Sequence, residues 1–333
     1  MKKYKIHSMY LDATTSISDL ESYLNAIGFL DPKTEQIRAV EKPGEGNMNV
    51  VLRIRTDKRS FIVKQSRPFV QKYPQIVAPI ERIDVEYRFY KAVTNKAIAP
   101  HIPEILTYNA DNHVLLLEDL GDCKDMSYLY GERNIEASQL DQLLDIASQI
   151  HTSTPKAYPR NMELRLLNHQ HIFVLPFLKE NDFSLNTVQE GLQELALPYR
   201  NDEPLKKEIA KVGQQYLSEG NTLLHGDYYP GSWMAKGDHI YVIDPEFSFM
   251  GFAEFDIGVL AAHSILITMD TDCLQTIKSR YPGRLNGLLL AQVAGIELMR
   301  RLIGLAQLPL KRSIQEKKLL LELARALILD KSS

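Results

Sequence analysis

In the first third of the chain, apolar and polar residues alternate in short runs, which is the period of a half-buried β-strand. Turn-favouring residues, mainly Gly, Pro, Asn and Asp, separate these runs. A helix is predicted to begin with a capping box at Ser18 and Glu21 and to end at Gly28. A second helix is predicted from Pro79 to about Val93. The predicted strands are residues 37–42, 47–54, 60–64, 104–108 and 113–118.

Past Gly121 the apolar period lengthens to about 3.6 residues, which is typical of α-helices. The most apolar of these segments, 285–306, contains charged residues, so we predict a buried helix and not a membrane span. His151 ends the first of these helices and is expected to be stabilised by the helix dipole. The predicted elements here are helices at 136–150, 203–218, 255–267, 285–306 and 313–329, and a strand at 240–243.

The change of period predicts an α+β fold with two domains, a sheet-rich lobe at residues 1–119 and a larger, mainly helical lobe at 120–333. A length of 333 residues suits two such lobes. With 39 basic and 42 acidic residues, the net charge of −3 gives no bulk attraction to nucleic acid or to an anionic membrane. Cys123 and Cys273 lack the CxxC spacing of a zinc or redox site. With no signal-peptide pattern at the N-terminus, we expect a cytoplasmic protein.

A glycine-bearing loop connects the first two predicted strands. It contains Gly44, Gly46, Asn47 and Asn49, and its glycines would let backbone N–H groups approach a phosphate. The alternative is an ordinary hairpin turn, since Asn49 stands where a dinucleotide-binding motif has its third glycine.

Lys64 ends the third predicted strand on the same face as Ile62, where an ammonium group needs a partner. Glu86 lies in the apolar stripe of the next helix and would supply it. Such a pair would hold Lys64 near nucleotide phosphates. The alternative is a strand-end lysine in water.

Three carboxylates follow short apolar runs in the helical lobe. His225, Gly226 and Asp227 come first, and Asp244 and Glu246 follow the strand at 240–243. Asp244 and Glu246 suit Mg²⁺, which prefers oxygen ligands, and this leaves Asp227 to orient a hydroxyl group. For any single aspartate, a turn or cap role is the alternative.

The order of these features resembles the protein-kinase-like small-molecule kinases, which include aminoglycoside phosphotransferases and choline kinases. The resemblance implies a protein-kinase-like two-lobed fold, ATP and Mg²⁺ as cofactors, and a small-molecule acceptor. It also implies that the backbone around Glu118 and Leu120 meets adenine. Ser232 stands where most of these relatives carry a metal-binding Asn, and His225 is expected to brace the loop of Asp227 without exchanging protons.

Within that group the chain more closely resembles methylthioribose kinases. The shared segments include Val63-Lys64-Gln65, residues 225–232 and Asp244-Pro245-Glu246-Phe247. The resemblance implies that Arg300 and Arg301 hold a sugar. Two features weaken the inference that this chain shares the substrate of the family. Typical family members are longer, and Tyr228-Tyr229-Pro230 departs from the pattern expected after His-Gly-Asp.

The arginine pair also allows a structural interpretation, as part of an ion pair on a helix. Glu297 and Arg301 are four residues apart, which suits a surface ion pair, whereas Arg300 has no partner at that spacing. Adjacent helical residues point about 100° apart, so entry of both side chains into one pocket requires that the pocket wrap the helix or that the side chains bend.

We therefore predict an ATP- and Mg²⁺-dependent kinase that phosphorylates a hydroxyl group of methylthioribose or a related sugar. One alternative is an aminoglycoside or amino-alcohol kinase, whose cationic acceptor an arginine pair would repel. The other is a kinase-like nucleotide-binding protein without turnover. A symmetric homodimer is the default oligomer, with the apolar segment 313–329 forming either its interface or part of the core.

Overall fold

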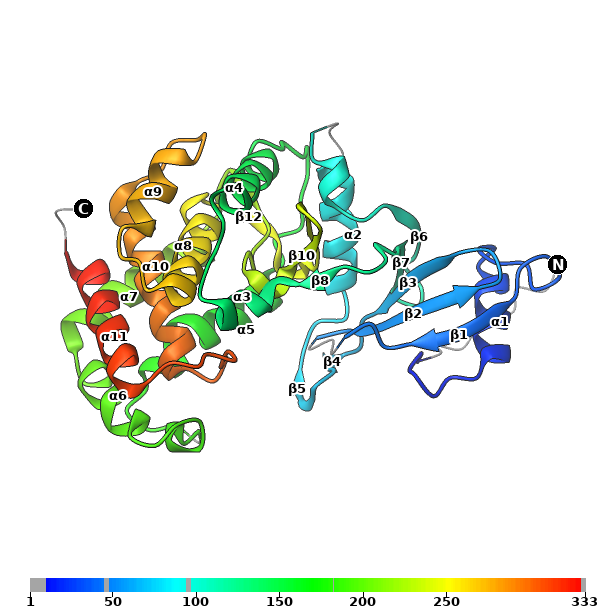
Figure 1. The fold of residues 1–333 in the computed structure, drawn as a ribbon. Coiled ribbons are helices and arrows are strands. Elements are labelled where there is room, and N and C mark those ends of the chain that lie inside the picture. The colour runs from blue at the N-terminus through cyan, green and yellow to red at the C-terminus, as the bar shows by residue number, and fades with distance from the viewer. Residues whose placement is uncertain (1–9, 45–47, 94–96, 182, 331–333) are drawn as a thin grey trace. The chain divides into compact units, whose positions relative to one another are not determined.

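The computed structural model describes residues 10–44, 48–93, 97–181 and 183–330. It divides into two compact units, Met1–Asp122 and Cys123–Ser333 (Figure 1). The boundary predicted at residues 119 and 120 lies close to this division.

The first unit is built on a five-stranded antiparallel sheet with the order β1-β2-β3-β7-β6. All five strands were predicted, and their ends differ from the prediction by at most three residues. The strands are β1 (Ile37–Glu41), β2 (Val50–Thr56), β3 (Ser60–Gln65), β6 (Ile105–Asn109) and β7 (Val114–Glu118).

Two helices pack on this sheet. Helix α1 (Ile17–Ala26) packs with Phe61 and Val63 of β3 in one apolar core. Successive strand residues face opposite sides, so Lys64 lies on the other face, where α2 (Arg82–Ala92) supplies its partner.

The N-cap of α1 is Ser16, whose hydroxyl accepts the N–H of Asp19. The predicted capping box at Ser18 and Glu21 was therefore wrong. Gly28, with φ of 75°, is the predicted glycine at the other end of the helix.

The first unit also contains a hairpin that was not predicted, formed by β4 (Phe69–Val70) and β5 (Tyr73–Val77). Most of its residues are exposed, so it has no apolar alternation by which to recognise it. Arg82 is fully buried beside it and donates hydrogen bonds to four carbonyl groups, including those of Phe69 and Met48.

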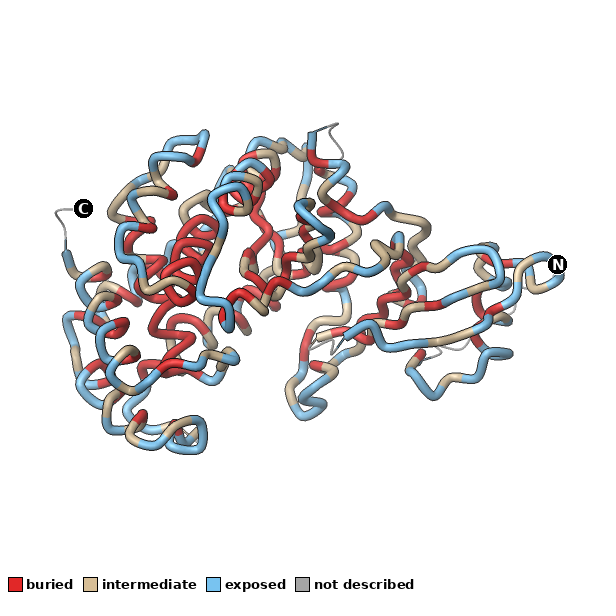
Figure 2. The backbone as a smooth tube through the Cα atoms, in the orientation of Figure 1, coloured by how far each residue is buried: buried red, intermediate tan, exposed pale blue. Residues whose placement is uncertain are grey.

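The second unit is mainly helical, and two of its helices are buried around almost their whole circumference (Figure 2). They are α8 (Glu254–Thr268) and α10 (Gly287–Ile303), which pack against each other. A helix that is apolar on all sides belongs in a core. The other helices are α3 (Leu129–Glu132), α4 (Ala137–His151), α5 (Met162–His169), α6 (Leu192–Arg200), α7 (Glu203–Leu217), α9 (Cys273–Arg280) and α11 (Ile314–Leu329).

Short strands in this unit carry the loops of interest. Strand β10 lies between β11 and β8, and β9 pairs with β12. Only β11 was predicted; β8, β9 and β12 span two or three residues, which is too short to show a period. They are β8 (Lys124–Asp125), β9 (Thr222–Leu224), β10 (Trp233–Lys236), β11 (His239–Val242) and β12 (Phe249–Gly251).

Helix α11 packs on α10 through Leu320, Leu321, Ala324 and Ile328, so the segment 313–329 contributes to the core. The described residues include no helix with the length and apolarity needed to cross a bilayer. The predicted α+β class, with a sheet-rich first part and a helical second part, is confirmed.

Candidate active site

Lys64 and Glu86 form a buried ion pair in the first unit. Lys64 Nζ lies 2.7 Å and 2.8 Å from the two carboxylate oxygens of Glu86. Lys64 is 4% exposed and Glu86 is 0% exposed. The alternative of a lysine in water is therefore excluded.

Hydrogen bonds fix the C-terminal end of the glycine loop, at Met48 and Asn49. Asn49 is buried and accepts a hydrogen bond from the hydroxyl of Ser66, while Arg82 binds the carbonyl of Met48. Gly44 is exposed, with open space where a Cβ would lie. Gly46 and Asn47 lie outside the described residues.

Glu118 is the last residue of β7, and its carboxylate accepts the N–H of Glu104. Leu120 follows two residues later and is half-buried. The predicted contact of this backbone with adenine remains a prediction.

In the second unit, the His-Gly-Asp loop is fixed by a residue that sequence reasoning missed. Asp256, in the first turn of α8, accepts hydrogen bonds from the backbone N–H of His225 at 2.7 Å and of Gly226 at 3.0 Å. Its Oδ2 also lies 3.1 Å from His151 Nε2. The sequence feature that could have identified Asp256 is that it is the single acidic residue in the apolar segment 255–267. His151 therefore has a side-chain partner in addition to its place at a helix end.

Gly226 makes the turn that brings Asp227 out of the strand. Its φ is 86°, and a Cβ at this position would lie 2.2 Å from the carbonyl oxygen of Phe247. Only glycine tolerates both the conformation and the close approach.

The hydrogen bonds of His225 define its tautomer. Its Nε2 lies 2.9 Å from the carbonyl oxygen of Ile243, so this nitrogen donates, and its Nδ1 accepts the N–H of Asp227 at 3.3 Å. Burial lowers the pKa of His225, which keeps the ring neutral. With both nitrogens engaged, the ring connects the loop of Asp227 with the segment that leads to Asp244.

Asp244, Glu246 and Ser232 lie close along connected backbone. The carbonyl of Ser232 accepts the N–H of Ile243, next to Asp244. Asp244 has φ of 62°, a left-handed conformation that is uncommon for aspartate and concentrates at functional sites. Glu246 and Ser232 are buried. Over the described ranges, no three His, Cys, Asp or Glu side chains cluster as metal ligands.

The arginine pair is buried in the second unit. Arg300 Nη1 donates to both carboxylate oxygens of Glu297, at 3.2 Å and 3.0 Å, and Arg301 Nε donates to the same carboxylate at 2.6 Å. Glu297 is only 1% exposed. The Glu297–Arg301 ion pair considered from the sequence is present, but it is buried and not on the surface. Arg300, which has no partner at a spacing of four residues, pairs with Glu297 at a spacing of three.

Arg301 lies beside the proposed catalytic aspartate. Its Nη2 is 3.9 Å from Asp227 Oδ1, and its guanidinium carbon lies over the ring of Tyr229, 4.6 Å from the centroid. The two tyrosines after His-Gly-Asp therefore lie in different surroundings. Tyr229 contacts Arg301, whereas Tyr228 is buried and its hydroxyl donates to the carbonyl of Leu143.

The charges of this cluster control its ionisation. Burial raises the pKa of Asp227, although Arg301 and Arg300 act in the opposite direction. Burial alone would also raise the pKa of Glu297, but the same two arginines hold it well below its usual range. Two guanidinium groups and two carboxylates thus balance in charge.

A second candidate that the sequence did not indicate is His171. It lies on the π-helix Gln170–Val174, which packs against α10, and π-helical turns are frequent at functional sites. Burial and the charge of Arg300 lower the pKa of His171, which favours a neutral ring beside the arginine pair.

The model of a family described as "Phosphotransferase enzyme family" matches residues 39–286. Curated relatives include a methylthioribose kinase of Exiguobacterium sibiricum, 30% identical over 239 residues, and one of Geobacillus sp., 24% identical over 355 residues. The first alignment covers 67% of this chain and 60% of that relative, and the second covers 89% and 87%. The chain thus spans less than two thirds of the Exiguobacterium protein.

Among solved structures, the choline kinase LicA of Streptococcus pneumoniae aligns with a TM-score of 0.53 at 13% identity, over 93% of this chain and 98% of that one. A spectinomycin phosphotransferase in complex with ADP and spectinomycin aligns with a TM-score of 0.52 at 12% identity, over 95% and 100%. At these identities the likeness concerns the fold, and it confirms the predicted protein-kinase-like class.

Proposed function

The chain belongs to the phosphotransferase enzyme family, and we propose that it transfers the γ-phosphate of ATP to a hydroxyl group of methylthioribose or a closely related sugar. The observation that carries this proposal is the position of Arg301, which contacts Glu297 and lies 3.9 Å from Asp227. A sugar-binding arginine pair and a catalytic carboxylate are then neighbours within one unit.

In this proposal the first unit binds the nucleotide. The ammonium group of Lys64, held by both oxygens of Glu86, binds phosphate oxygens, and the loop that contains Gly44, Gly46, Asn47 and Asn49 covers the phosphates. The backbone at Glu118 and Leu120 contacts adenine. These are the parts by which kinase-like folds orient ATP.

Asp244 and Glu246 provide the donor set that Mg²⁺ takes in nucleotide sites, one or two carboxylates completed by phosphate oxygens and water. The left-handed backbone of Asp244 and the burial of Glu246 suit such a role, and Ser232 is a third oxygen donor nearby. When bound, the ion would neutralise charge on the phosphates of ATP.

Asp227 orients the acceptor hydroxyl and takes its proton as the new oxygen–phosphorus bond forms. The bond between the γ-phosphorus and the bridging oxygen breaks in line with the attack, and ADP leaves. His225 and Asp256 hold the loop in place, and neither needs to change protonation state.

The charge balance of the arginine cluster favours a neutral, hydroxyl-rich acceptor. Glu297 and Asp227 offset the two guanidinium groups, so no excess positive charge is left for an anionic acceptor. A cationic acceptor such as choline or an aminoglycoside would lie beside two guanidinium groups, with both carboxylates already offset and none left to attract it. Arg300 Nε has no hydrogen-bond partner among the described residues and is available to donate to a sugar hydroxyl.

The decisive experiment measures magnesium-dependent ADP release from ATP with methylthioribose, ribose, choline and kanamycin as acceptors. Asp227→Asn serves as the blank. Turnover on methylthioribose alone supports the sugar kinase and a place in methionine salvage. Turnover on choline or kanamycin alone would transfer support to the amino-alcohol or aminoglycoside kinase. ATP binding without turnover on any acceptor would favour the nucleotide-binding protein without activity.

We also propose a cytoplasmic location, on the grounds that Cys123 and Cys273 are free thiols. A homodimer remains the default proposal for the oligomeric state. Light scattering of the purified chain would test it directly.

A further inference from the structure

Arg300 and Arg301 are adjacent on α10, and side chains at adjacent helical positions leave the axis about 100° apart. Glu297, one turn earlier, nevertheless binds both guanidinium groups. It lies 3.0 Å from Arg300 Nη1 and 2.6 Å from Arg301 Nε. One carboxylate therefore draws two diverging side chains to the same side of the helix.

Glu297 is itself held from the neighbouring helix. His263 of α8 has Nε2 at 3.1 Å from Glu297 Oε1 and Nδ1 at 2.6 Å from the hydroxyl of Tyr130 on α3. Because Glu297 is ionised and can only accept, His263 Nε2 donates and its Nδ1 accepts from Tyr130. Burial lowers the pKa of His263 to about 4, so this neutral tautomer persists at pH 7.

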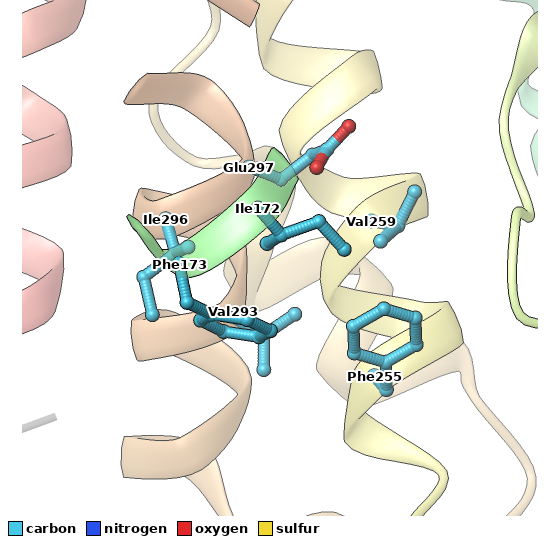
Figure 3. Close-up of a pocket in the computed structure, with 7 residues that line it drawn as sticks. All are labelled: Ile172, Phe173, Phe255, Val259, Val293, Ile296 and Glu297. Atoms are coloured by element: carbon cyan, nitrogen blue, oxygen red, sulfur yellow. The ribbon is translucent and has the colours of Figure 1, made fainter. Parts of the chain in front are cut away.

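The remaining surroundings of Glu297 are apolar. Figure 3 shows it at a small pocket with Phe255, Val259 and Val293, and no water molecule fits into this space. A carboxylate that turned away from the arginines would therefore lose its hydrogen bonds without gaining solvent. The side chain has one favourable orientation, toward Arg300, Arg301 and His263.

We propose that Glu297, oriented by the Tyr130–His263 hydrogen-bond pair, is the positioning residue that presents Arg300 and Arg301 to the acceptor. This inference rests on the proposed function, because it assigns the acceptor to the arginine pair. Glu297 does not touch the acceptor and acts through the two guanidinium groups. It leaves Arg300 Nε available and keeps Arg301 beside Asp227.

The kinetic test compares Glu297→Gln with the wild-type chain. The amide keeps the size of the side chain but cannot accept from both arginines as a carboxylate does. We expect the KM for the acceptor to rise by about 10-fold or more, with the KM for ATP unchanged and kcat lowered by less than about 3-fold. Glu297→Asp, which restores the charge, should recover part of the acceptor KM.

Glu316→Gln is the control, because Glu316, in the first turn of α11, pairs with Arg312 four residues earlier, away from the arginine pair of α10. It should leave the acceptor KM unchanged. If Glu297→Gln does not fold, His263→Asn supplies the test, since it withdraws the donor of Glu297 and should raise the same KM. An unchanged acceptor KM in a folded variant would overturn the proposal.

A second readout needs no acceptor. The Nε–H proton of Arg301, assigned by Arg301→Lys, should appear strongly downfield in the NMR spectrum because of its short bond to Glu297. It should move upfield in Glu297→Gln and stay in place in Glu316→Gln. If no acceptor is phosphorylated but the Arg301 Nε–H signal behaves as expected, the result counts against the proposed function alone. If this signal does not move in Glu297→Gln, the positioning role of Glu297 is overturned.

Discussion

The guanidinium group of Arg301 lies over the aromatic ring of Tyr229, 4.6 Å from its centroid. Tyr229 follows Asp227 by two residues, so the loop that carries the carboxylate also carries the surface on which the arginine lies. The Tyr228-Tyr229-Pro230 segment, which departs from the expected pattern, therefore has a physical role in the acceptor cluster. A cation over an aromatic ring is worth about 0.5 to 2 kcal/mol, depending on solvation.

We expect Tyr229→Phe to keep the KM for the acceptor within about 2-fold, because the ring face remains under Arg301. Tyr229→Ala removes the ring and should raise this KM by about 2- to 30-fold, the equivalent of that interaction energy. Steady-state kinetics at saturating ATP measure both. Equal effects of the two variants would show that the hydroxyl group, and not the ring face, matters.

A second prediction concerns the Lys64–Glu86 pair. Glu86→Gln leaves a buried ammonium group without its counter-charge, so we expect a loss of about 3 to 5 kcal/mol of unfolding free energy and a higher KM for ATP. Chemical denaturation and ADP release measure the two effects.

The control is the double variant Lys64→Met with Glu86→Gln. It should recover much of the lost stability, because no unpaired charge remains, while turnover is abolished for want of the ammonium group. A double variant less stable than Glu86→Gln alone would contradict the assignment of the destabilisation to an unpaired charge.

Much of the fold could be predicted because its main elements are long enough to show a period. The five sheet strands and the helices α4, α7, α8, α10 and α11 each bury one face or all faces, and their residues alternate accordingly. The hairpin β4–β5 and the short strands of the second unit carry too few residues for a period. At α1, Ser16 with Asp19 competed with Ser18 and Glu21 for the same cap, and spacing alone did not decide between them.

The site was predictable where a charged side chain on an apolar face requires a partner of opposite charge. Lys64 on an apolar face requires a partner, and Glu86 was the carboxylate within the facing stripe of the next helix. The role of Glu297 toward Arg300 was missed because the helix was assessed at a spacing of four residues. Asp256 and His263 act on residues that are distant in the sequence, so only the packing of α8 reveals them.

Asp256→Asn gives a third prediction. Its carboxylate accepts two backbone N–H groups of the His-Gly-Asp loop, and the amide side chain of Asn would place a donor against one of them. We expect a loss of about 2 to 4 kcal/mol in unfolding free energy and a fall in kcat of about 10-fold or more, since Asp227 loses its fixed position.

Calorimetry and turnover at 10 °C, where the variant remains folded, would separate the two losses. His151→Gln is the matched control, because it removes another partner of Asp256 and leaves both backbone contacts in place. It should affect stability more than kcat. An Asp256→Asn variant that is destabilised but fully active at low temperature would remove Asp256 from the support of the loop.

The final prediction concerns stability at acid pH. Burial lowers the pKa of His263 from 6.5 to about 4, and the charged groups that act on it are Glu297, Arg301 and Arg300. As the pH falls from 6.5 to about 4, the unfolded chain binds a proton at this histidine while the native chain does not. Protonation therefore favours the unfolded chain, and stability falls by about 3 kcal/mol over this range.

Urea denaturation at pH 7, 6, 5 and 4 would measure this loss. His225 also has a lowered pKa and contributes in the same direction, so the wild-type curve must be compared with that of His263→Gln. The difference in unfolding free energy between the two chains should shrink as the pH falls, because the variant has no group to protonate at this position. Glu297, whose pKa lies well below its usual value of 4.5, loses its contribution progressively as the pH falls below about 4.5. A difference that stays constant from pH 7 to pH 4 would mean that His263 is not held neutral between Glu297 and Tyr130.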